Sequence, residues 1–282
     1  MRKRISFISV LTMFLAIGFV IIFSRPVKAV ANGVILKSNR TYTAYDVTGD
    51  GTKDKIRIRA SNQTDDEAYS SLTVSVNGKT AYRLTNTRFY NVIANIYTLK
   101  NGQPFLYLYA PADNGDGPVC ALLKYTNGKF RKILDFTEIM AGYGNHRIGE
   151  VTNLNGNKIV ITESIVSYSL GINAINFTYK YVNGKFVPTS RYGSYKEIYS
   201  ADGSSRYFTV NSDLPAYARP GATAVNTTLK TGSLTKIIKC ALISGKMYIQ
   251  LECDGEIYWI KALENPPIAD NERQFMEVRY AG

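Results

Sequence analysis

Apolar and polar residues alternate along most of the chain in short runs, and turn-forming residues separate the runs. Residues 55–60 place two isoleucines and an alanine on one side and three basic residues on the other. Residues 175–181 repeat the alternation with an aromatic inner side. Because successive side chains of a β-strand point to opposite faces, a period of two predicts half-buried strands. The helix-like stretch at 136–141 is short, so the pattern predicts an all-β protein.

Asn-Gly pairs divide this pattern at intervals of 24 to 28 residues. A two-residue type I′ turn needs positive φ at both central positions, which Asn tolerates and Gly accepts freely, so each pair predicts a β-hairpin. The stretches 125–130 and 181–186 share Tyr-x-Asn-Gly-Lys-Phe, which indicates an internal repeat of hairpins. Five hairpins imply about ten strands, too few for a complete propeller of four-stranded blades, so an open antiparallel sheet or a sandwich is predicted. The pairs are Asn77-Gly78, Asn101-Gly102, Asn127-Gly128, Asn155-Gly156 and Asn183-Gly184.

Residues 1–31 have the character of a secretory signal peptide. Three basic residues at 2–4 precede an uncharged run over 5–23, and the small-x-small triplet Ala29-Val30-Ala31 follows. Cleavage is predicted before Asn32. The apolar run is also long enough to span a bilayer if it is not cleaved. In either case we expect the rest of the chain to be secreted or extracellular. Membrane contact is expected only if the leader is not cleaved, and then only through 5–23.

The turn at 46–54 has the spacing of a calcium loop. Side-chain oxygens occupy loop positions 1, 3, 5 and 9, and a glycine occupies position 6, where such loops turn sharply. At loop position 12 an EF-hand has a glutamate, whereas this chain has Arg57, so the loop is not an EF-hand. It resembles instead the DxDxDG-type calcium loops of FG-GAP and VCBS repeats, in which an acidic turn leads into a strand. The alternative is a solvated Asp/Gly turn without metal. The predicted calcium ligands are Asp46, Thr48, Asp50, Thr52 through its carbonyl, and Asp54.

A second unit is predicted after the polar cluster at 202–205, which gives a β-hairpin domain over 32–204 and a further domain over 205–282. Residues 207–261 resemble a bacterial SH3 domain: 214–221 match its opening segment, 229–234 the turn into its central strands, and 247–260 its closing strands. The resemblance implies a small SH3-like barrel that targets the cell wall. The chain departs from the family at Tyr258, where glycine is usual, and at 247–248, where a second tryptophan is common.

Aromatic side chains offer rigid contact area at a small entropic cost, and the second unit carries the chain's only tryptophan. We therefore predict that Tyr217, Arg219, Tyr258 and Trp259 bind a cell-wall peptide or an anionic wall polymer. The alternative is that Trp259 belongs to the core of the module and that Tyr217 is structural.

The cysteines and the histidine limit the possible chemistry. Three cysteines, at 120, 240 and 253, are an odd number for a secreted chain, and residues this sparse are predicted to be small core hydrophobes rather than a disulfide or a nucleophile. His146 is the only histidine, which excludes a histidine-rich zinc site. A Cys120–His146 pair stays possible, although no protease signature surrounds either residue.

The chain is basic, with 34 Lys and Arg against 22 Asp and Glu. Five of the basic residues lie in the leader, which leaves 29 against 22, or +7, after cleavage. Outside a cell such a charge attracts wall polymers, lipid headgroups or host glycans. The sequence has no basic helix, dense basic run or nucleic-acid motif, so no nucleic-acid partner is expected.

These features together predict a secreted, non-enzymatic binding protein of a Gram-positive-like surface, with calcium as its cofactor and an SH3-like module that associates with the wall. One alternative is a wall or glycan hydrolase with its catalytic site in 32–204. Another is an adhesin whose binding surface lies in the same residues.

Overall fold

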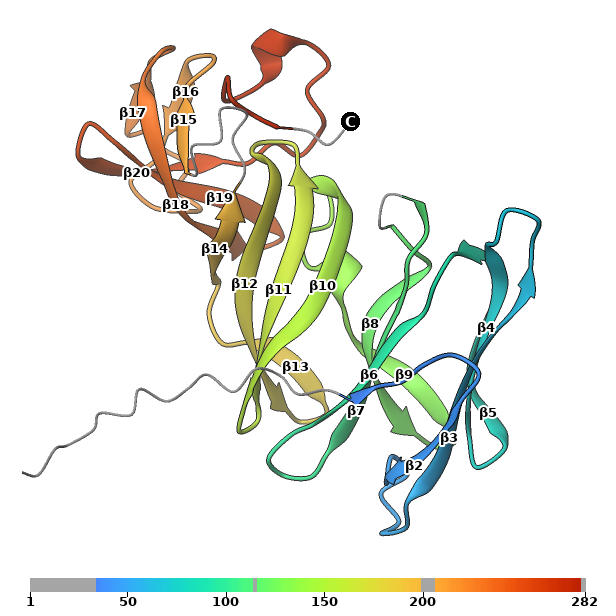
Figure 1. Cartoon of the computed structure of the whole chain (residues 1–282). Helices are drawn as coiled ribbons and strands as arrows, with labels where there is room; N and C mark the ends of the chain where they lie inside the picture. The colour runs from blue at the N-terminus through green and yellow to red at the C-terminus, as the bar shows by residue number, and fades with distance from the viewer. Residues whose placement is uncertain (1–33, 114–115, 199–205, 280–282) are drawn as a thin grey trace, which may run out of the picture.

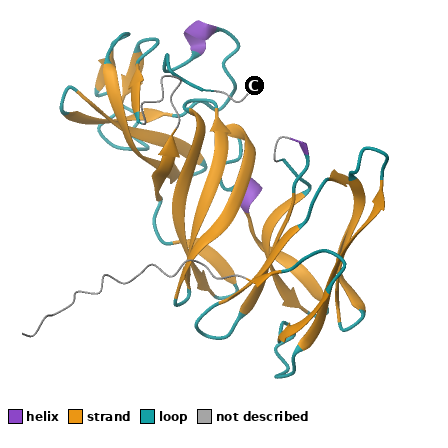
Figure 2. Ribbon diagram, in the orientation of Figure 1, coloured by secondary structure: helices purple, strands orange, loops and turns teal. Residues whose placement is uncertain are grey.

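The computed structural model describes residues 34–113, 116–198 and 206–279. Strands dominate the described chain, every pairing between them is antiparallel, and the helical elements are short 3-10 turns such as η2 (Phe136–Glu138) and η3 (Asp270–Glu272) (Figures 1 and 2). The predicted all-β class is confirmed. No described helix has the length and apolar character that a membrane span requires. The predicted leader, 1–31, lies outside the described residues.

Two sheets pack face to face in the N-terminal part. The four-stranded sheet has the order β2 (Thr41–Tyr45), β3 (Asp54–Gln63), β4 (Tyr69–Val76) and β5 (Lys79–Phe89). The five-stranded sheet has the order β1 (Val34–Ile35), β6 (Ile93–Thr98), β7 (Pro104–Ala110), β8 (Val119–Thr126) and β9 (Lys129–Asp135). A buried cluster rich in Ile, Val, Leu and Ala from both sheets fills the space between them.

Strand β7 is buried on both faces. Its aliphatic residues Leu106, Leu108 and Ala110 face the four-stranded sheet, whereas Phe105, Tyr107 and Tyr109 belong to the cluster on the other side. Alternation within an entirely apolar run therefore assigns aliphatic side chains to one core and aromatic ones to another.

The remaining strands form a large sheet and a small one. The nine-stranded sheet has the order β10 (Gly144–Asn155), β11 (Lys158–Ser167), β12 (Gly171–Val182), β14 (Tyr192–Ile198), β18 (Leu234–Ile243), β19 (Lys246–Cys253) and β20 (Glu256–Lys261), with β13 (Lys185–Pro188) on β12 and β15 (Tyr207–Thr209) on β18. Strands β16 (Leu214–Ala216) and β17 (Thr227–Leu229) pair with each other. In Figure 1, β10–β12 stand between the N-terminal sheets and the C-terminal strands.

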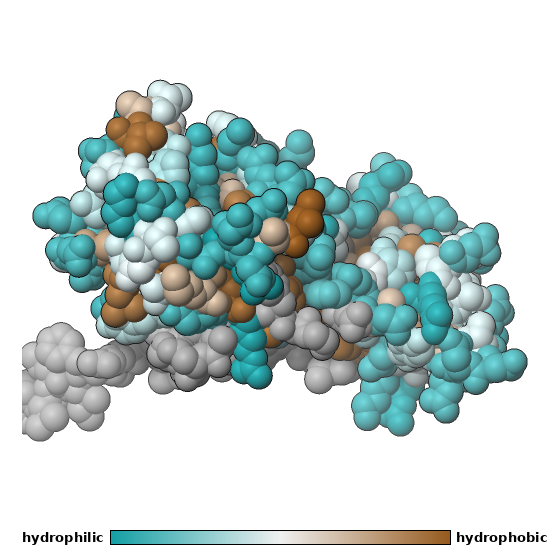
Figure 3. All heavy atoms as spheres, turned by 90° about the horizontal axis from the view of Figure 1, so that it is seen from above, coloured by the Kyte–Doolittle hydropathy of each residue, from teal (hydrophilic) through white to brown (hydrophobic). Residues whose placement is uncertain are grey.

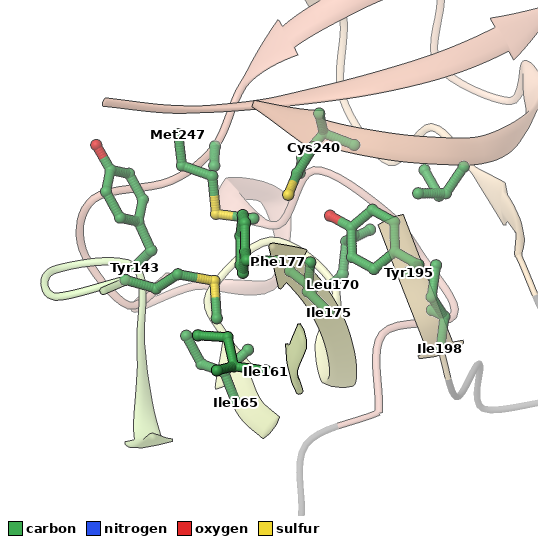
Figure 4. Close-up of a cluster of buried hydrophobic side chains, with 14 of the residues drawn as sticks. Tyr143, Ile161, Ile165, Leu170, Ile175, Phe177, Tyr195, Ile198, Cys240 and Met247 are labelled. Carbon is green, nitrogen blue, oxygen red and sulfur yellow. The ribbon is translucent and has the colours of Figure 1, made fainter. Parts of the chain in front are cut away.

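The large sheet joins the two parts into which we divided the sequence. Strand β14 pairs with β18, with Gly193 opposite Cys240. One buried cluster includes Phe177 and Tyr195 from the first part and Cys240 and Met247 from the second (Figure 4). The boundary predicted at 202–205 itself lies outside the described residues.

The Asn-Gly pairs form two kinds of turn. At 77–78, 127–128 and 183–184 both residues have positive φ, as a type I′ turn requires. At 101–102 and 155–156 only the glycine does. At 155–156, Asn155 is the last residue of its strand and pairs with Lys158. Gly156 is therefore the first residue of a two-residue loop, and this is the position where type II′ turns take glycine.

Candidate functional sites

The loop at 46–54 is closed by its own hydrogen bonds. Asp54, at the start of β3, is buried and accepts hydrogen bonds from the N–H groups of Val47 (2.7 Å) and Thr48 (2.9 Å) and from Nδ2 of Asn77 (2.6 Å). Asp46 accepts from two glycine N–H groups further along the loop. The carboxylates of Asp46 and Asp54 therefore accept hydrogen bonds from the protein's own N–H groups, most of them in the backbone.

The other predicted ligands lie nearer to solvent. The N–H of Thr52 donates to the Asp50 carboxylate at 2.7 Å, and the Thr48 hydroxyl lies 3.2 Å from Asp46 and 3.3 Å from Asp54. Within the described ranges, no three Asp, Glu, His or Cys side chains converge as a metal site requires. Calcium binding at this loop stays a prediction of the sequence.

The structure brings together two of the four residues predicted to bind a wall ligand. Tyr217 and Trp259 exchange backbone hydrogen bonds of 2.7 and 2.9 Å, and their buried side chains pack with Tyr248 in a small cluster separate from the main core. Tyr258 precedes Trp259 on β20 and packs against the main core instead. Arg219 is exposed.

Cations surround this small cluster. Nζ of Lys239 lies 4.7 Å from the ring centroid of Tyr192 and 5.9 Å from that of Trp259, and Nζ of Lys261 lies 5.1 Å from that of Tyr217. The Arg191 guanidinium lies over the Tyr192 ring. We call these six residues, Arg191, Tyr192, Tyr217, Lys239, Trp259 and Lys261, the aromatic–cationic cluster. Tyr192 and Arg191 were not predicted from the sequence, because they precede the predicted boundary.

A second region of interest lies where β10, the edge strand of the large sheet, contacts the five-stranded sheet. The hydroxyl of Tyr107 on β7 donates to the Gly149 carbonyl at 2.8 Å, and the Cys120 thiol on β8 donates to the same oxygen at 3.4 Å. These contacts fix β10 against the aromatic face of β7. Two pockets adjoin this contact, and Tyr109 lines both.

The first pocket is polar and has a volume of about 340 Å³. His146 lines this pocket, and its Nδ1 lies 3.0 Å from the Asp116 carboxylate. This is close enough for an ion pair, but the geometry is not that of a hydrogen bond. Cys120 also lines the pocket, but burial raises the pKa of the thiol to about 12. A thiol is nucleophilic only as the thiolate, so Cys120 is a weak nucleophile in this buried state. All three cysteines are buried free thiols, as predicted for core residues.

The second pocket, of about 290 Å³, is lined by Tyr97, Tyr107 and Tyr109 together with Asn95 and Glu150. Rings of Tyr97 and Tyr107 meet edge to face at 6.3 Å between centroids. Burial raises the pKa of the Tyr97 hydroxyl and of the Tyr107 hydroxyl. The nearby Glu150 carboxylate raises both pKa values further, because its negative charge disfavours a second one. Burial likewise raises the pKa of Tyr109, to about 12.

Glu163 is a buried carboxyl group in the core between these sheets. It lies on β11 opposite Gly149, its residue exposure is 0%, and neither carboxylate oxygen has a hydrogen-bond partner within the described chain. Burial raises the pKa of this carboxyl well above its usual value, and the nearby Arg147 offsets this only in part. Its isolation from solvent argues against a role in catalysis.

Glu163 makes stability depend on pH. Its folded-state pKa is raised, so between the unfolded pKa, about 4.3, and the folded pKa the folded state binds more protons, and stability falls as pH rises through this window. We expect Glu163→Gln to flatten this slope in urea unfolding measured from pH 4 to 8. Glu163→Leu, which also removes the unpartnered oxygens, should raise the free energy of unfolding at pH 7 by about 1–3 kcal/mol.

The control for this experiment is Glu256→Gln, because Glu256 is exposed on β20. It should keep the wild-type slope. Equal slopes for wild type and Glu163→Gln would show that Glu163 does not titrate differently in the folded protein.

Comparison with known proteins identifies no relative. No protein-family model, curated protein or solved structure matches the chain. The function is therefore argued from the sites alone.

Proposed function

We propose that this protein is a secreted or cell-surface binding protein without enzymatic activity, which associates with a Gram-positive-like cell wall through residues of its C-terminal part. The observation that carries the proposal is the aromatic–cationic cluster. Its three cations lie over three aromatic rings. Because the rings of Tyr217 and Trp259 are themselves buried, the cations form a positively charged surface over a rigid aromatic layer. An anionic wall polymer is the ligand that fits this charge outside a cell.

The SH3-like resemblance supports the same proposal. The segments on which the resemblance was based form strands β16 to β20, and Tyr217 and Trp259 lie side by side in the paired backbone. Strands β18, β19 and β20 continue the large sheet, however, and the described strands do not close into the separate barrel that the resemblance implies. Tyr258 is on the other face of β20, so Tyr192 takes its place in the proposed surface. The ring centroids of Tyr192 and Trp259 are 5.9 Å apart.

The alternative of a hydrolase has weaker support. Two groups with strongly raised pKa values, Cys120 and Glu163, are 2% and 0% exposed. A general acid or nucleophile must reach the substrate, and neither group does so in this arrangement. The described residues therefore favour binding over hydrolysis.

The proposal predicts that the double variant Lys239→Gln, Lys261→Gln binds purified Gram-positive cell walls about tenfold more weakly than wild type at low salt, because two cations over aromatic rings are lost. The matched control is Lys158→Gln, Lys180→Gln, two exposed lysines paired across β11 and β12. Both double variants lower the net charge equally. Both double variants are expected to melt near the wild-type temperature. If the two lose the same amount of wall binding, overall charge rather than the aromatic–cationic cluster is responsible.

A further inference from the structure

The pocket beside β10 differs from the rest of this basic protein in its charge. Hydrophilic side chains, lysines and arginines among them, cover much of the surface, as the view in Figure 3 illustrates. Within the described residues, however, the only charged side chain that lines this pocket is Glu150. The remaining polar lining consists of three tyrosines, Asn95 and Ser164. A cationic ligand would thus meet no repulsive charge in the wall of the pocket.

Among the described residues, the hydrogen bonds around the pocket leave one buried acceptor without a partner. Asn95 donates through Nδ2 to the hydroxyl of Tyr97 at 3.2 Å, and its Oδ1 is buried with no hydrogen-bond partner in the described chain. The hydroxyl of Tyr107 already donates to the Gly149 carbonyl. A buried acceptor without a partner costs free energy, and its partial negative charge is lowered in energy by a positive charge placed near Asn95.

The tyrosine rings supply a second attraction for positive charge. Tyr97 and Tyr107 pack edge to face with an interplanar angle of 65°, and both line the pocket together with Tyr109. The face of an aromatic ring carries negative electrostatic potential, and several rings around one space attract an ammonium group once it has lost its water. Glu150 then completes the charge balance.

We propose that this pocket binds an ammonium group, preferably an alkylated one such as a trimethylammonium. Methyl groups on the nitrogen increase contact with the rings and reduce the cost of dehydration, while the full positive charge is retained. The site lies between β6, β7 and β10, apart from the aromatic–cationic cluster, and does not depend on the wall-binding proposal.

The test is calorimetric titration of the full chain with choline chloride and, separately, with 3,3-dimethyl-1-butanol, which has the same shape without the charge. We expect choline to bind with a dissociation constant of about 1–10 mM, as a few cation–π contacts provide, and the neutral analogue to bind at least tenfold more weakly. Equal affinity for the two compounds, or no choline binding at 50 mM, would overturn the proposal.

Variants locate the binding. Glu150 is exposed on β10, so Glu150→Gln should leave the melting temperature unchanged and weaken choline binding about three- to thirtyfold. Glu138→Gln is the control, because Glu138 is also exposed but does not line this pocket. Tyr97→Phe keeps the ring and should retain most of the affinity, whereas Tyr97→Leu should lose it. Wild-type choline affinity in both Glu150→Gln and Tyr97→Leu would refute the assignment to this pocket.

Discussion

Residues 205–282, produced alone, are expected not to fold cooperatively. In the whole chain, β14 covers one edge of β18, and three residue pairs form the contact, Gly193–Cys240 among them. The Arg206 guanidinium donates to the Tyr195 carbonyl across the same junction. A fragment that begins at 205 loses this strand and exposes Cys240, which is 0% accessible in the whole chain. An unpaired edge and an uncovered apolar face destabilise a small β-unit.

Urea unfolding of residues 32–282, 32–204 and 205–282 tests this expectation. The longest chain should unfold with a clear transition, and the shortest should show no sigmoidal transition at all. A matched pair of variants tests the junction in the intact chain. A Cβ added at Gly193 would lie 2.5 Å from the Phe177 ring, so Gly193→Ala should lower the melting temperature, whereas Ser194→Ala, at the exposed neighbour, should not. A 205–282 fragment with the midpoint of the whole chain would contradict the account.

The second large effect is expected at Asp54. Replacing it with alanine leaves the N–H groups of Val47 and Thr48 and the Asn77 amide without their acceptor. Buried donors that lose a charged partner cost about 1–3 kcal/mol each, so Asp54→Ala should lower the free energy of unfolding by about 3 kcal/mol or more. Asp50→Ala is the control, since Asp50 is exposed and accepts a bond from Thr52. Equal midpoints for the two variants in urea would show that the buried bonds are not responsible.

The same proteins test the calcium prediction. Melting curves of wild type and Asp50→Ala are recorded in 5 mM calcium chloride and in excess chelator. An ion that binds only the folded state raises its stability by mass action. If calcium raises the melting temperature of wild type and not of Asp50→Ala, the sequence prediction holds. Identical wild-type curves in calcium and chelator would remove calcium as a cofactor and leave the loop as a hydrogen-bonded turn.

Local features of the fold were readable from the sequence. Alternation predicted strands such as β3, and the Asn-Gly pairs predicted hairpin turns, because both signals depend on residues within a few positions of each other. The type I′ turn predicted at 155–156 was wrong, because turn type depends on the register of the two strands. In the observed register Asn155 is still paired with Lys158 and is not a loop residue. The acidic spacing at 46–54 likewise marked the turn, but it did not show that Asp54 alone is buried or which donors the carboxylates meet.

Pairings between distant segments could not be predicted in this way. The contact of β14 with β18 joins residues about fifty positions apart in the sequence, and no local pattern encodes it. The tyrosine pocket combines β6, β7 and β10, and its only local signal is the alternate spacing of Tyr107 and Tyr109 on β7. Tyr192 became part of the proposed wall-binding surface only through the cross-sheet contact that brings its ring to Trp259.

The most direct test of the proposed function is co-sedimentation of the protein with purified Gram-positive cell walls, before and after chemical removal of their anionic polymers. The account predicts binding to intact walls that weakens as sodium chloride rises from about 0.05 to 0.5 M, because screening reduces attraction between exposed charges. It also predicts little binding to the stripped walls. Binding that is equally strong to stripped walls and insensitive to salt, or no binding to intact walls at low salt, would contradict the claim that this protein recognises an anionic wall polymer.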